Sequence, residues 1–190
     1  MSDKIQGQVI KKITTKSGKE VELRLVSWSD LDEMTAYINQ LSQEDTFITF
    51  SGEVITREGE AKYLAQSLVD IEMGNKIIVV ASIDGKQVGV SDVTRITAAK
   101  ERKKHVGVLG ISIKKEFRGD GIGKELMQTA IEEAKRRISG LRQIILEVYG
   151  KNDIARAMYK KLGFVEAGSI PGGLIYKGEY IDDITMYLQL

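Results

Sequence analysis

The chain has no cysteine and a single histidine, His105, among its 190 residues. The absence of cysteine excludes disulfides, thiolate metal ligands and an acyl-cysteine intermediate. With only one histidine, a zinc site built from several histidines is excluded as well. Any chemistry must therefore use carboxylates, tyrosines, lysines and backbone amides, and we expect no metal site.

The chain also lacks any apolar run near the roughly 20 residues that a membrane helix requires. Residues 1–12 alternate polar and apolar side chains and contain no signal-peptide core, so we expect a cytoplasmic protein. The 28 basic and 27 acidic residues are interspersed and give a net charge of +1, unlike the basic stripe of a nucleic-acid binder. The sequence thus predicts neither a membrane partner nor a nucleic-acid partner.

No linker rich in proline, glycine or serine divides the chain, and no internal repeat is visible. A chain of this size can bury roughly 70% of its unfolded surface in one core. We therefore predict a single domain over residues 1–190, in which residues 1–20 contribute an additional N-terminal strand hairpin.

Hydrophobic periodicity predicts both strands and helices. The predicted strands are 5–15, 19–26, 77–83, 87–94, 105–113, 144–148, 164–170 and 181–188, and the predicted helices are about 30–41, 56–73, 122–138 and 155–162. Asp30 and Thr56 are expected to cap the first two helices, and Asp84-Gly85-Lys86 is typical of a hairpin turn. Antiparallel hairpins combined with strand–helix–strand units indicate an α/β fold, a mixed sheet with helices on both faces.

The most informative segment is Arg118-Gly119-Asp120-Gly121-Ile122-Gly123, which joins a predicted strand to a predicted helix. Such a turn directs several backbone N–H groups at one point, where the helix dipole adds positive charge. Its glycines permit positive φ angles and a close approach of the ligand to the backbone. The segment therefore predicts a site for a phosphate or pyrophosphate.

Two common phosphate-binding motifs do not fit this turn. A P-loop requires Ser or Thr after Gly-Lys, but Gly123-Lys124 is followed by Glu125. Counted from Gly119, the third glycine of a dinucleotide fingerprint falls on Lys124. Glu147 lies at about the ribose-binding spacing but within a strand, so a nicotinamide-dependent oxidoreductase is a disfavoured alternative.

The pattern Arg118-x-x-Gly121-x-Gly123 resembles the pyrophosphate signature of the GCN5-related N-acetyltransferases (GNAT). A second segment resembles that family's other cofactor motif and comprises Leu146-Glu147-Val148, Asn152, Ala155, Tyr159 and Leu162-Gly163-Phe164. The two motifs together span about residues 106–168 in the family's order. On these residues the chain is similar to the branch of bacterial ribosomal-protein N-terminal acetyltransferases and small-amine acetyltransferases.

The resemblance implies a GNAT-like, largely antiparallel sheet whose strands splay at the acetyl-coenzyme A site. It also implies transfer of an acetyl group from acetyl-coenzyme A to a protein N-terminus or small amine, by direct attack in a ternary complex. A non-catalytic sensor module that binds acyl-coenzyme A is the alternative. Because sheet edges in this family often pair between chains, a homodimer is a further expectation.

The resemblance also implies a set of cofactor-binding residues in the turn, the strand before it and the second motif. These are Ile111, Ser112, Ile113, Arg118, Gly119, Asp120, Gly121, Ile122, Gly123, Lys124, Asn152 and Ala155. A backbone amide within 111–113 can also stabilise the oxyanion. For Asn152, a turn-forming role before a helix is an equally good interpretation.

Tyr159 is the expected general acid, because a phenol with an ordinary pKa near 10 stays protonated at neutral pH. The alternative is a packed aromatic side chain. Glu147, which stands twelve residues earlier, is the expected base, as the resemblance to the ribosomal-protein acetyltransferases implies. A carboxylate in an apolar strand is costly unless it is paired or faces a cleft, and burial would raise its pKa. The alternatives are a surface position for Glu147 and a water chain as the base.

In this family the first two helices, their loop and the last strand pair line the acceptor groove. The corresponding segments here are 44–47, Glu53 and 176–183. Within them Asp182, Asp183 and Glu179 can attract a cationic amine, although solvated loop charges are the favoured interpretation.

Overall fold

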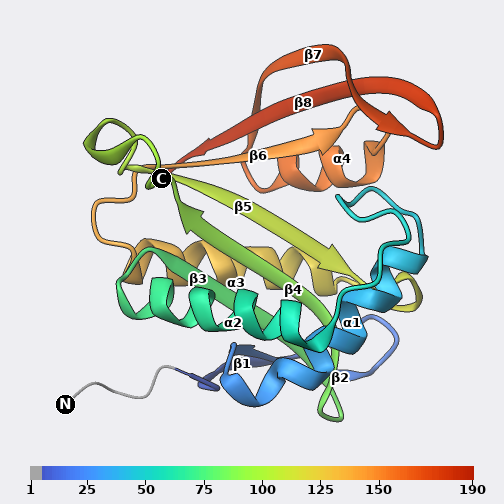
Figure 1. The fold of residues 1–190 in the computed structure, drawn as a ribbon, viewed down its shortest axis with the longest axis vertical. Helices are drawn as coiled ribbons and strands as arrows, with labels where there is room; N and C mark the ends of the chain where they lie inside the picture. The colour runs from blue at the N-terminus through green and yellow to red at the C-terminus, as the bar shows by residue number, and fades with distance from the viewer. Residues whose placement is uncertain (1–5) are drawn as a thin grey trace. The chain divides into compact units, whose positions relative to one another are not determined.

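The computed structural model describes residues 6–190, with the side chain of Lys100 excepted, so Ile5 of the predicted first strand lies outside the described residues. Every predicted helix and strand is present (Figure 1). In chain order they are β1 (Val9–Thr14), β2 (Glu20–Leu25), α1 (Leu31–Gln43), α2 (Arg57–Glu72), β3 (Lys76–Ile83), β4 (Lys86–Arg95), β5 (Val106–Ile113), α3 (Ile122–Arg137), β6 (Gln143–Tyr149), α4 (Asp153–Lys161), β7 (Val165–Tyr176) and β8 (Glu179–Gln189). No helix in this described part of the chain is long and apolar enough to cross a membrane.

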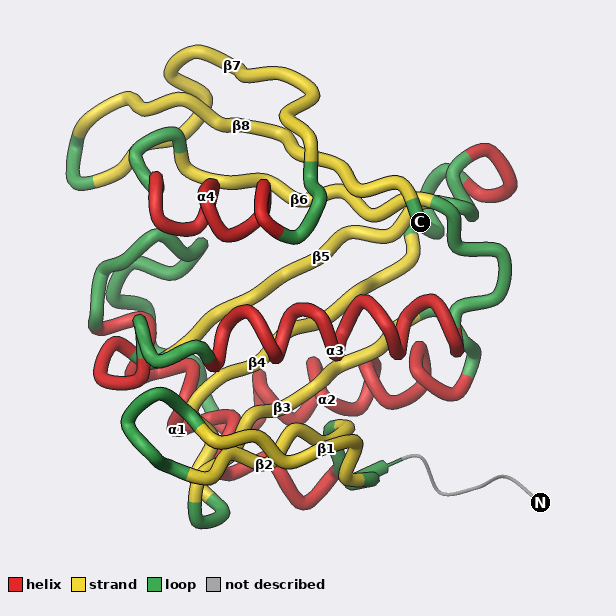
Figure 2. The backbone as a smooth tube through the Cα atoms, turned by 180° about the vertical axis from the view of Figure 1, so that it is seen from behind, coloured by secondary structure: helices red, strands yellow, loops and turns green. Residues whose placement is uncertain are grey.

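The strands form one sheet in the order β1-β2-β3-β4-β5-β6-β8-β7, shown in yellow in Figure 2. The pairs β1–β2, β2–β3, β3–β4, β6–β8 and β7–β8 are antiparallel. In contrast, β5 and β6 are parallel, with Val106–Val108 opposite Gln143–Ile145. The mixed, largely antiparallel fold class is therefore confirmed, whereas the splay of strands at the cofactor site stays a prediction.

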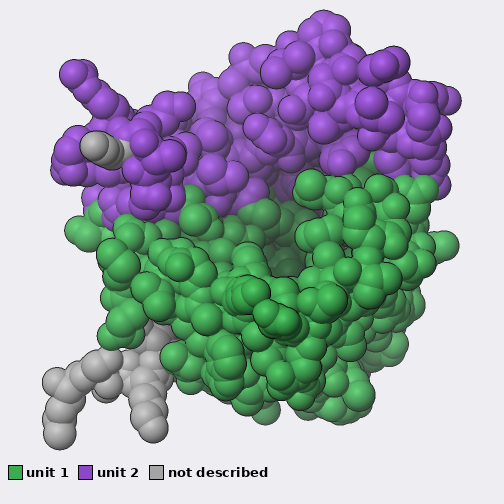
Figure 3. All heavy atoms as spheres, in the orientation of Figure 1, with its two compact units in different colours: residues 1–94, 110–139 green, residues 95–109, 140–190 purple. Residues whose placement is uncertain are grey.

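The chain divides into two compact units (Figure 3). Unit 1 comprises Met1–Thr94 and Gly110–Ser139, and unit 2 comprises Arg95–Leu109 and Gly140–Leu190. Strand β5 passes from unit 2 into unit 1 after Leu109. The single N-acetyltransferase domain over residues 1–190 stays a prediction.

In unit 1, helices cover both faces of the sheet. Figures 1 and 2 show α1 and α2 over one face and α3 over the other. Strand β3 is buried from Lys76 to Ser82, because α1 and α2 cover Ile78 and Val80 while α3 packs on the strand from the other side. Burial on both faces explains why this strand reads as a continuous apolar run instead of an alternating one.

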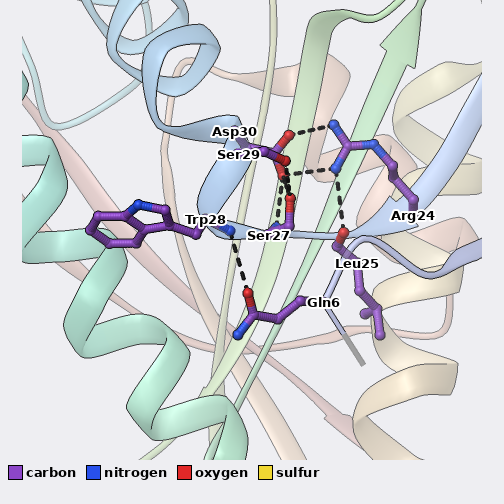
Figure 4. Close-up of polar contacts among 7 residues, drawn as sticks. All are labelled: Gln6, Arg24, Leu25, Ser27, Trp28, Ser29 and Asp30. Carbon is purple, nitrogen blue, oxygen red and sulfur yellow. Dashed lines mark hydrogen bonds and ion pairs between the residues drawn. The ribbon is translucent and has the colours of Figure 1, made fainter. Parts of the chain in front are cut away.

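Asp30 is the N-cap residue of α1, as predicted, but its side chain makes no capping hydrogen bond to that helix. A short 3-10 turn, Trp28–Asp30, precedes the helix, and the Asp30 carboxylate reaches back to accept the Ser27 N–H at 2.7 Å (Figure 4). The same carboxylate accepts two hydrogen bonds from the Arg24 guanidinium, at 2.7 and 2.5 Å. Because Arg24 belongs to β2 and Asp30 is only 5% exposed, this buried ion pair fixes the first helix to the sheet.

Thr56 does cap α2, since its hydroxyl accepts the Gly59 N–H at 3.1 Å. Asp84 and Gly85 both adopt positive φ, which is the backbone of the predicted hairpin turn between β3 and β4. Strand β7 is longer than predicted, because an irregularity between Ile170 and Leu174 lets its pairing with β8 resume as far as Tyr176.

In unit 2, β6 lies between β5 and β8, in the central position predicted from its apolar sequence. Leu146 and Val148 are buried, and so are Ile184 and Met186 of β8. Helix α4 buries Tyr159, whose ring centroid lies 6.1 Å from that of Phe164. This packing holds the second predicted cofactor motif.

Candidate active site

The glycine turn has the backbone predicted for an anion site. Gly119 and Gly121 have φ angles of 79° and 93°, and Gly121 is the N-cap of α3. A Cβ added to either glycine meets no heavy atom within 4 Å, so the space above both is open. Ile122 is 1% exposed and anchors the first helical turn, whose N–H groups have no partner within the helix. Backbone donors are thus fixed beside a space that a phosphate can enter.

The strand before the turn is tied to α1 through its side chains. The hydroxyls of Tyr37 and Ser112 lie 2.9 Å apart, and burial raises the pKa of Tyr37 far above its usual value of 10. Ser112, Ile111 and Ile113 are all half-buried. A Cβ added to Gly89 of β4 would lie 2.4 Å from Ile113 Cδ1 and 3.3 Å from the Ser112 carbonyl oxygen, so this glycine packs closely against the strand. The Tyr37 hydroxyl and the close approach of Gly89 thus pack against the strand where the pantetheine arm is expected.

The side chain of Arg118, predicted to contact the cofactor, is paired with Glu44 at the end of α1. Its Nε also donates to the carbonyl of Ile113 at 2.8 Å. Glu44 in turn accepts the Lys115 N–H at 3.0 Å. The sequence placed Glu44 in the acceptor loop, but its carboxylate binds the glycine-turn segment.

Asp120, also predicted to contact the cofactor, anchors the N-terminal hairpin. Its carboxylate accepts the backbone N–H of Ser17 at 2.8 Å and the Ser17 hydroxyl at 2.5 Å. The Lys16 N–H donates to the Asp120 carbonyl at 3.3 Å. These hydrogen bonds from Ser17 hold the pKa of Asp120 below its usual value. Sequence reasoning missed this role of Ser17, because the partners are 103 positions apart and no local pattern signals the contact.

Gly123 and Lys124 lie in the first turn of α3, and Lys124 is exposed. In the second motif, the Oδ1 atom of Asn152 accepts the Ala155 N–H at 3.2 Å and caps α4. The turn-forming interpretation of Asn152 is therefore confirmed. Its amide nitrogen is the group that a pantetheine contact would use, and that contact stays a prediction.

Tyr159, the predicted acid, is 7% exposed, and burial raises the pKa of its phenol to about 12. Glu147, the predicted base, is exposed on β6, and its role as the base stays a prediction. Leu146 and Val148 point to the buried face of β6, which leaves Glu147 on the opposite face, across from Thr185 of β8. In the part of the chain that the structure describes, no group of three or more acidic, histidine or cysteine side chains is placed to hold a metal ion.

The match to known proteins decides the family. Residues 35–164 match the model of the acetyltransferase (GNAT) family. The chain belongs to this family. A solved GNAT-family acetyltransferase from Streptococcus pneumoniae is 30% identical, with a TM-score of 0.80 over 90% of this chain and 99% of that one.

Two curated relatives differ in the acceptor that their names state. The N-alpha-acetyltransferase of Sulfurisphaera tokodaii is 27% identical over 80% of this chain and 84% of that protein. The L-amino acid N-acetyltransferase AaaT of Escherichia coli is 32% identical over 56% of this chain and 64% of that protein. Two further acetyltransferases, 33% and 37% identical, are covered over only 26% and 45% of their lengths.

The predicted family, fold class and enzyme class are therefore confirmed, and acetyl-coenzyme A is the cosubstrate that this GNAT acetyltransferase uses. Two fold neighbours that are 18% and 16% identical were solved with acetyl-coenzyme A or coenzyme A. The nicotinamide alternative is accordingly abandoned.

Proposed function

We propose that this chain transfers the acetyl group of acetyl-coenzyme A to a primary amine, either a protein N-terminus or a small molecule, by direct attack in a ternary complex. The observation that carries the proposal is the open glycine turn at the N-terminus of α3, in a chain of the GNAT family. Relatives that are an N-alpha-acetyltransferase and an amino acid acetyltransferase support the two acceptor classes. The absence of cysteine agrees with a mechanism that forms no acyl-cysteine.

The cofactor role of the turn follows from its donors. The N–H groups at the start of α3 would bind the pyrophosphate, with Gly119 and Gly121 leaving room for its oxygens. Strand residues 111–113 would hold the pantetheine arm and supply an amide to the oxyanion. Asn152 would donate its amide N–H to the same arm.

In the chemical step, Glu147 would accept a proton from the acceptor ammonium, and the free amine would attack the thioester carbonyl. The attack forms the C–N bond, and collapse of the tetrahedral intermediate breaks the C–S bond. The remaining nitrogen proton passes to the departing coenzyme A sulfur, which leaves the neutral amide and the coenzyme A thiol. Tyr159, with a pKa of about 12, is protonated at every physiological pH and so is always a donor. Full transfer of this phenolic proton to the coenzyme A thiolate is unfavourable, because a thiol has an ordinary pKa near 8.5, well below that of Tyr159. Tyr159 would therefore stabilise the departing thiolate chiefly by hydrogen bonding.

The test is calorimetric titration with acetyl-coenzyme A, with NADH as the control ligand, followed by an acceptor screen that detects free thiol. We expect micromolar binding of acetyl-coenzyme A and thiol release with a primary amine. Glu147→Gln should lower the rate most at low pH, where the acceptor is protonated, while Glu179→Gln, whose carboxylate pairs with Lys151, should not. Binding without turnover on any amine would support the sensor alternative instead.

A further inference from the structure

The exposed face of the β6–β8 ladder brings polar groups beside Glu147. Glu147 lies opposite Thr185, and Tyr149 lies opposite Asp183, so all four side chains share one face. Diagonal neighbours in such a ladder have their backbones roughly 7 Å apart. A second carboxylate, that of Asp183, therefore lies two residue pairs along the strands from the proposed base, as a diagonal neighbour on the same face.

The structure separates the three carboxylates that the sequence grouped near the last strand. Glu179 forms an ion pair with Lys151. Asp182 accepts the Gly172 N–H at 3.2 Å. Asp183 differs from both, because its Oδ1 atom is buried and has no hydrogen-bond partner among the described residues.

A buried carboxylate oxygen without a donor is costly and rare in folded proteins. Here the backbone of β7 holds the side chain in place. A Cβ added to Gly173 would lie 2.9 Å from the Asp183 Cβ, so this glycine packs directly on the aspartate at the irregularity in β7. Packing thus fixes the Cβ of Asp183, and its buried Oδ1 has no hydrogen-bond donor among the described residues.

Two aromatic rings accompany this carboxylate. The rings of Tyr149 and Tyr176 meet edge to face, with centroids 6.0 Å apart. Burial, and then the charges of Asp183 and Tyr176, raise the pKa of Tyr149, in accord with its place beside the carboxylate. Aromatic faces attract ammonium groups. Tyr176 already shows this property, because the Lys177 ammonium lies 5.3 Å from its ring centroid.

We propose that Asp183, with Tyr149 and Tyr176, is the subsite that receives the ammonium group of the acceptor. An N–H of the ammonium donates to Asp183 Oδ1, and the rings contact the cation and its first carbon atoms. The substrate class is therefore a cationic primary amine that binds protonated and then loses one proton to Glu147. This inference rests on the proposed function and adds the group that recognises the acceptor.

The direct test is an NMR titration of the full chain, labelled with ¹³C in its tyrosine rings, with methylammonium chloride as the probe. Potassium chloride at equal ionic strength is the control salt. We expect saturable shifts of the Tyr149 and Tyr176 signals with methylammonium alone. Asp183→Asn should weaken binding at least tenfold, whereas Asp182→Asn, which removes the same charge one residue away, should change it less than twofold.

The absence of a saturable methylammonium shift in the unsubstituted protein, or equal binding by Asp183→Asn, would overturn the proposal. If the Asp183→Asn variant does not fold, Asp183→Ser replaces it. The methylammonium titration of the unsubstituted protein tests the proposal without any variant. With an amine found in the acceptor screen, Asp183→Asn should raise KM at least tenfold and leave acetyl-coenzyme A affinity unchanged. If methylammonium binds but no amine is acetylated, the proposed function fails and the subsite stands. If Asp183→Asn acetylates with an unchanged KM, only the subsite fails.

Discussion

Ser17 and Asp120 join the N-terminal hairpin to the glycine turn through two hydrogen bonds to one carboxylate, at 2.8 and 2.5 Å. The neighbouring contacts reinforce this junction, since Lys19 lies 5.0 Å from the Phe117 ring centroid and Lys11 pairs with Glu125. The hairpin at the start of the chain therefore braces the turn at which we place the pyrophosphate.

We predict that Ser17→Ala weakens acetyl-coenzyme A binding by about threefold, the size expected for the loss of one exposed hydrogen bond. The reason is that the Asp120 carboxylate loses its hydrogen bond from the Ser17 hydroxyl and keeps only the one from the Ser17 backbone N–H. Calorimetry measures the change in affinity. Ser17→Thr should restore the affinity, because threonine keeps the hydroxyl. Glu22→Gln is the control, because it removes an ion pair elsewhere in the hairpin.

The Ser17–Asp120 contact also has a predicted pH dependence. Because the pKa of Asp120 lies below the ordinary 3.8, the contact should persist at pH 4 and be lost only as the pH falls through that lowered pKa. Identical affinities for Ser17→Ala and the unsubstituted protein would remove the bracing role.

Gly121→Val is predicted to abolish acetyl-coenzyme A binding while the protein still folds. Valine is strained at a φ of 93° and fills the open space beside the N-terminus of α3. Gly85→Val is a matched control, because Gly85 also has positive φ, at 75°, and open space, but lies in the β3–β4 turn. Both variants should lose similar thermal stability, and only the first should lose the cofactor. Equal cofactor affinity in a folded Gly121→Val protein would contradict the pyrophosphate assignment.

Tyr159→Phe is predicted to lower kcat by about a hundredfold, because the departing sulfur loses the hydrogen bond that the phenol donates in the transition state. Acetyl-coenzyme A affinity should not change, and Tyr187→Phe on β8 serves as the control substitution. Thiol release under saturating substrates measures the effect. Unaltered turnover would make Tyr159 a packed aromatic residue only.

The raised pKa of Tyr159 also predicts that the free energy of unfolding falls at alkaline pH. Burial raises the pKa of Tyr159 from 10 to about 12, so the folded state keeps its phenol protonated while the unfolded state ionises. The stabilisation is complete below pH 10 and is lost between pH 10 and 12. Denaturant unfolding across this range should therefore show a shallower loss of stability in Tyr159→Phe than in the unsubstituted protein. If the free energy of unfolding falls equally steeply with pH in both proteins, this prediction is wrong.

Asp30→Asn is predicted to destabilise the fold by about 3 kcal/mol, because it leaves the half-buried Arg24 guanidinium without its counter-ion. For a chain of this size the loss lowers Tm by about 10 °C. Asp32→Asn is the control, since Asp32 also pairs with an arginine but its side chain is 78% exposed. Differential scanning calorimetry compares the two, and equal Tm values would show that the Arg24–Asp30 pair contributes nothing.

The sequence alone determined the elements and the class of cofactor, because these depend on local signals. Periodicity located the helices and strands, and the turn residues Asp84 and Gly85 marked the hairpin. The spacing of Arg118, Gly121 and Gly123 resembled the family's signature and so gave the family. Each of these features is set by residues a few positions apart.

Only the tertiary structure decided which of these polar side chains have hydrogen-bond partners within the protein and which have polar atoms without one. Glu44 binds the glycine-turn segment, Ser17 holds Asp120, and Asp183 keeps an unpartnered buried oxygen while its neighbour Asp182 does not. No local pattern separates two adjacent aspartates. Their roles depend on the register of β8 against β6 and β7, which forms from contacts between distant parts of the chain.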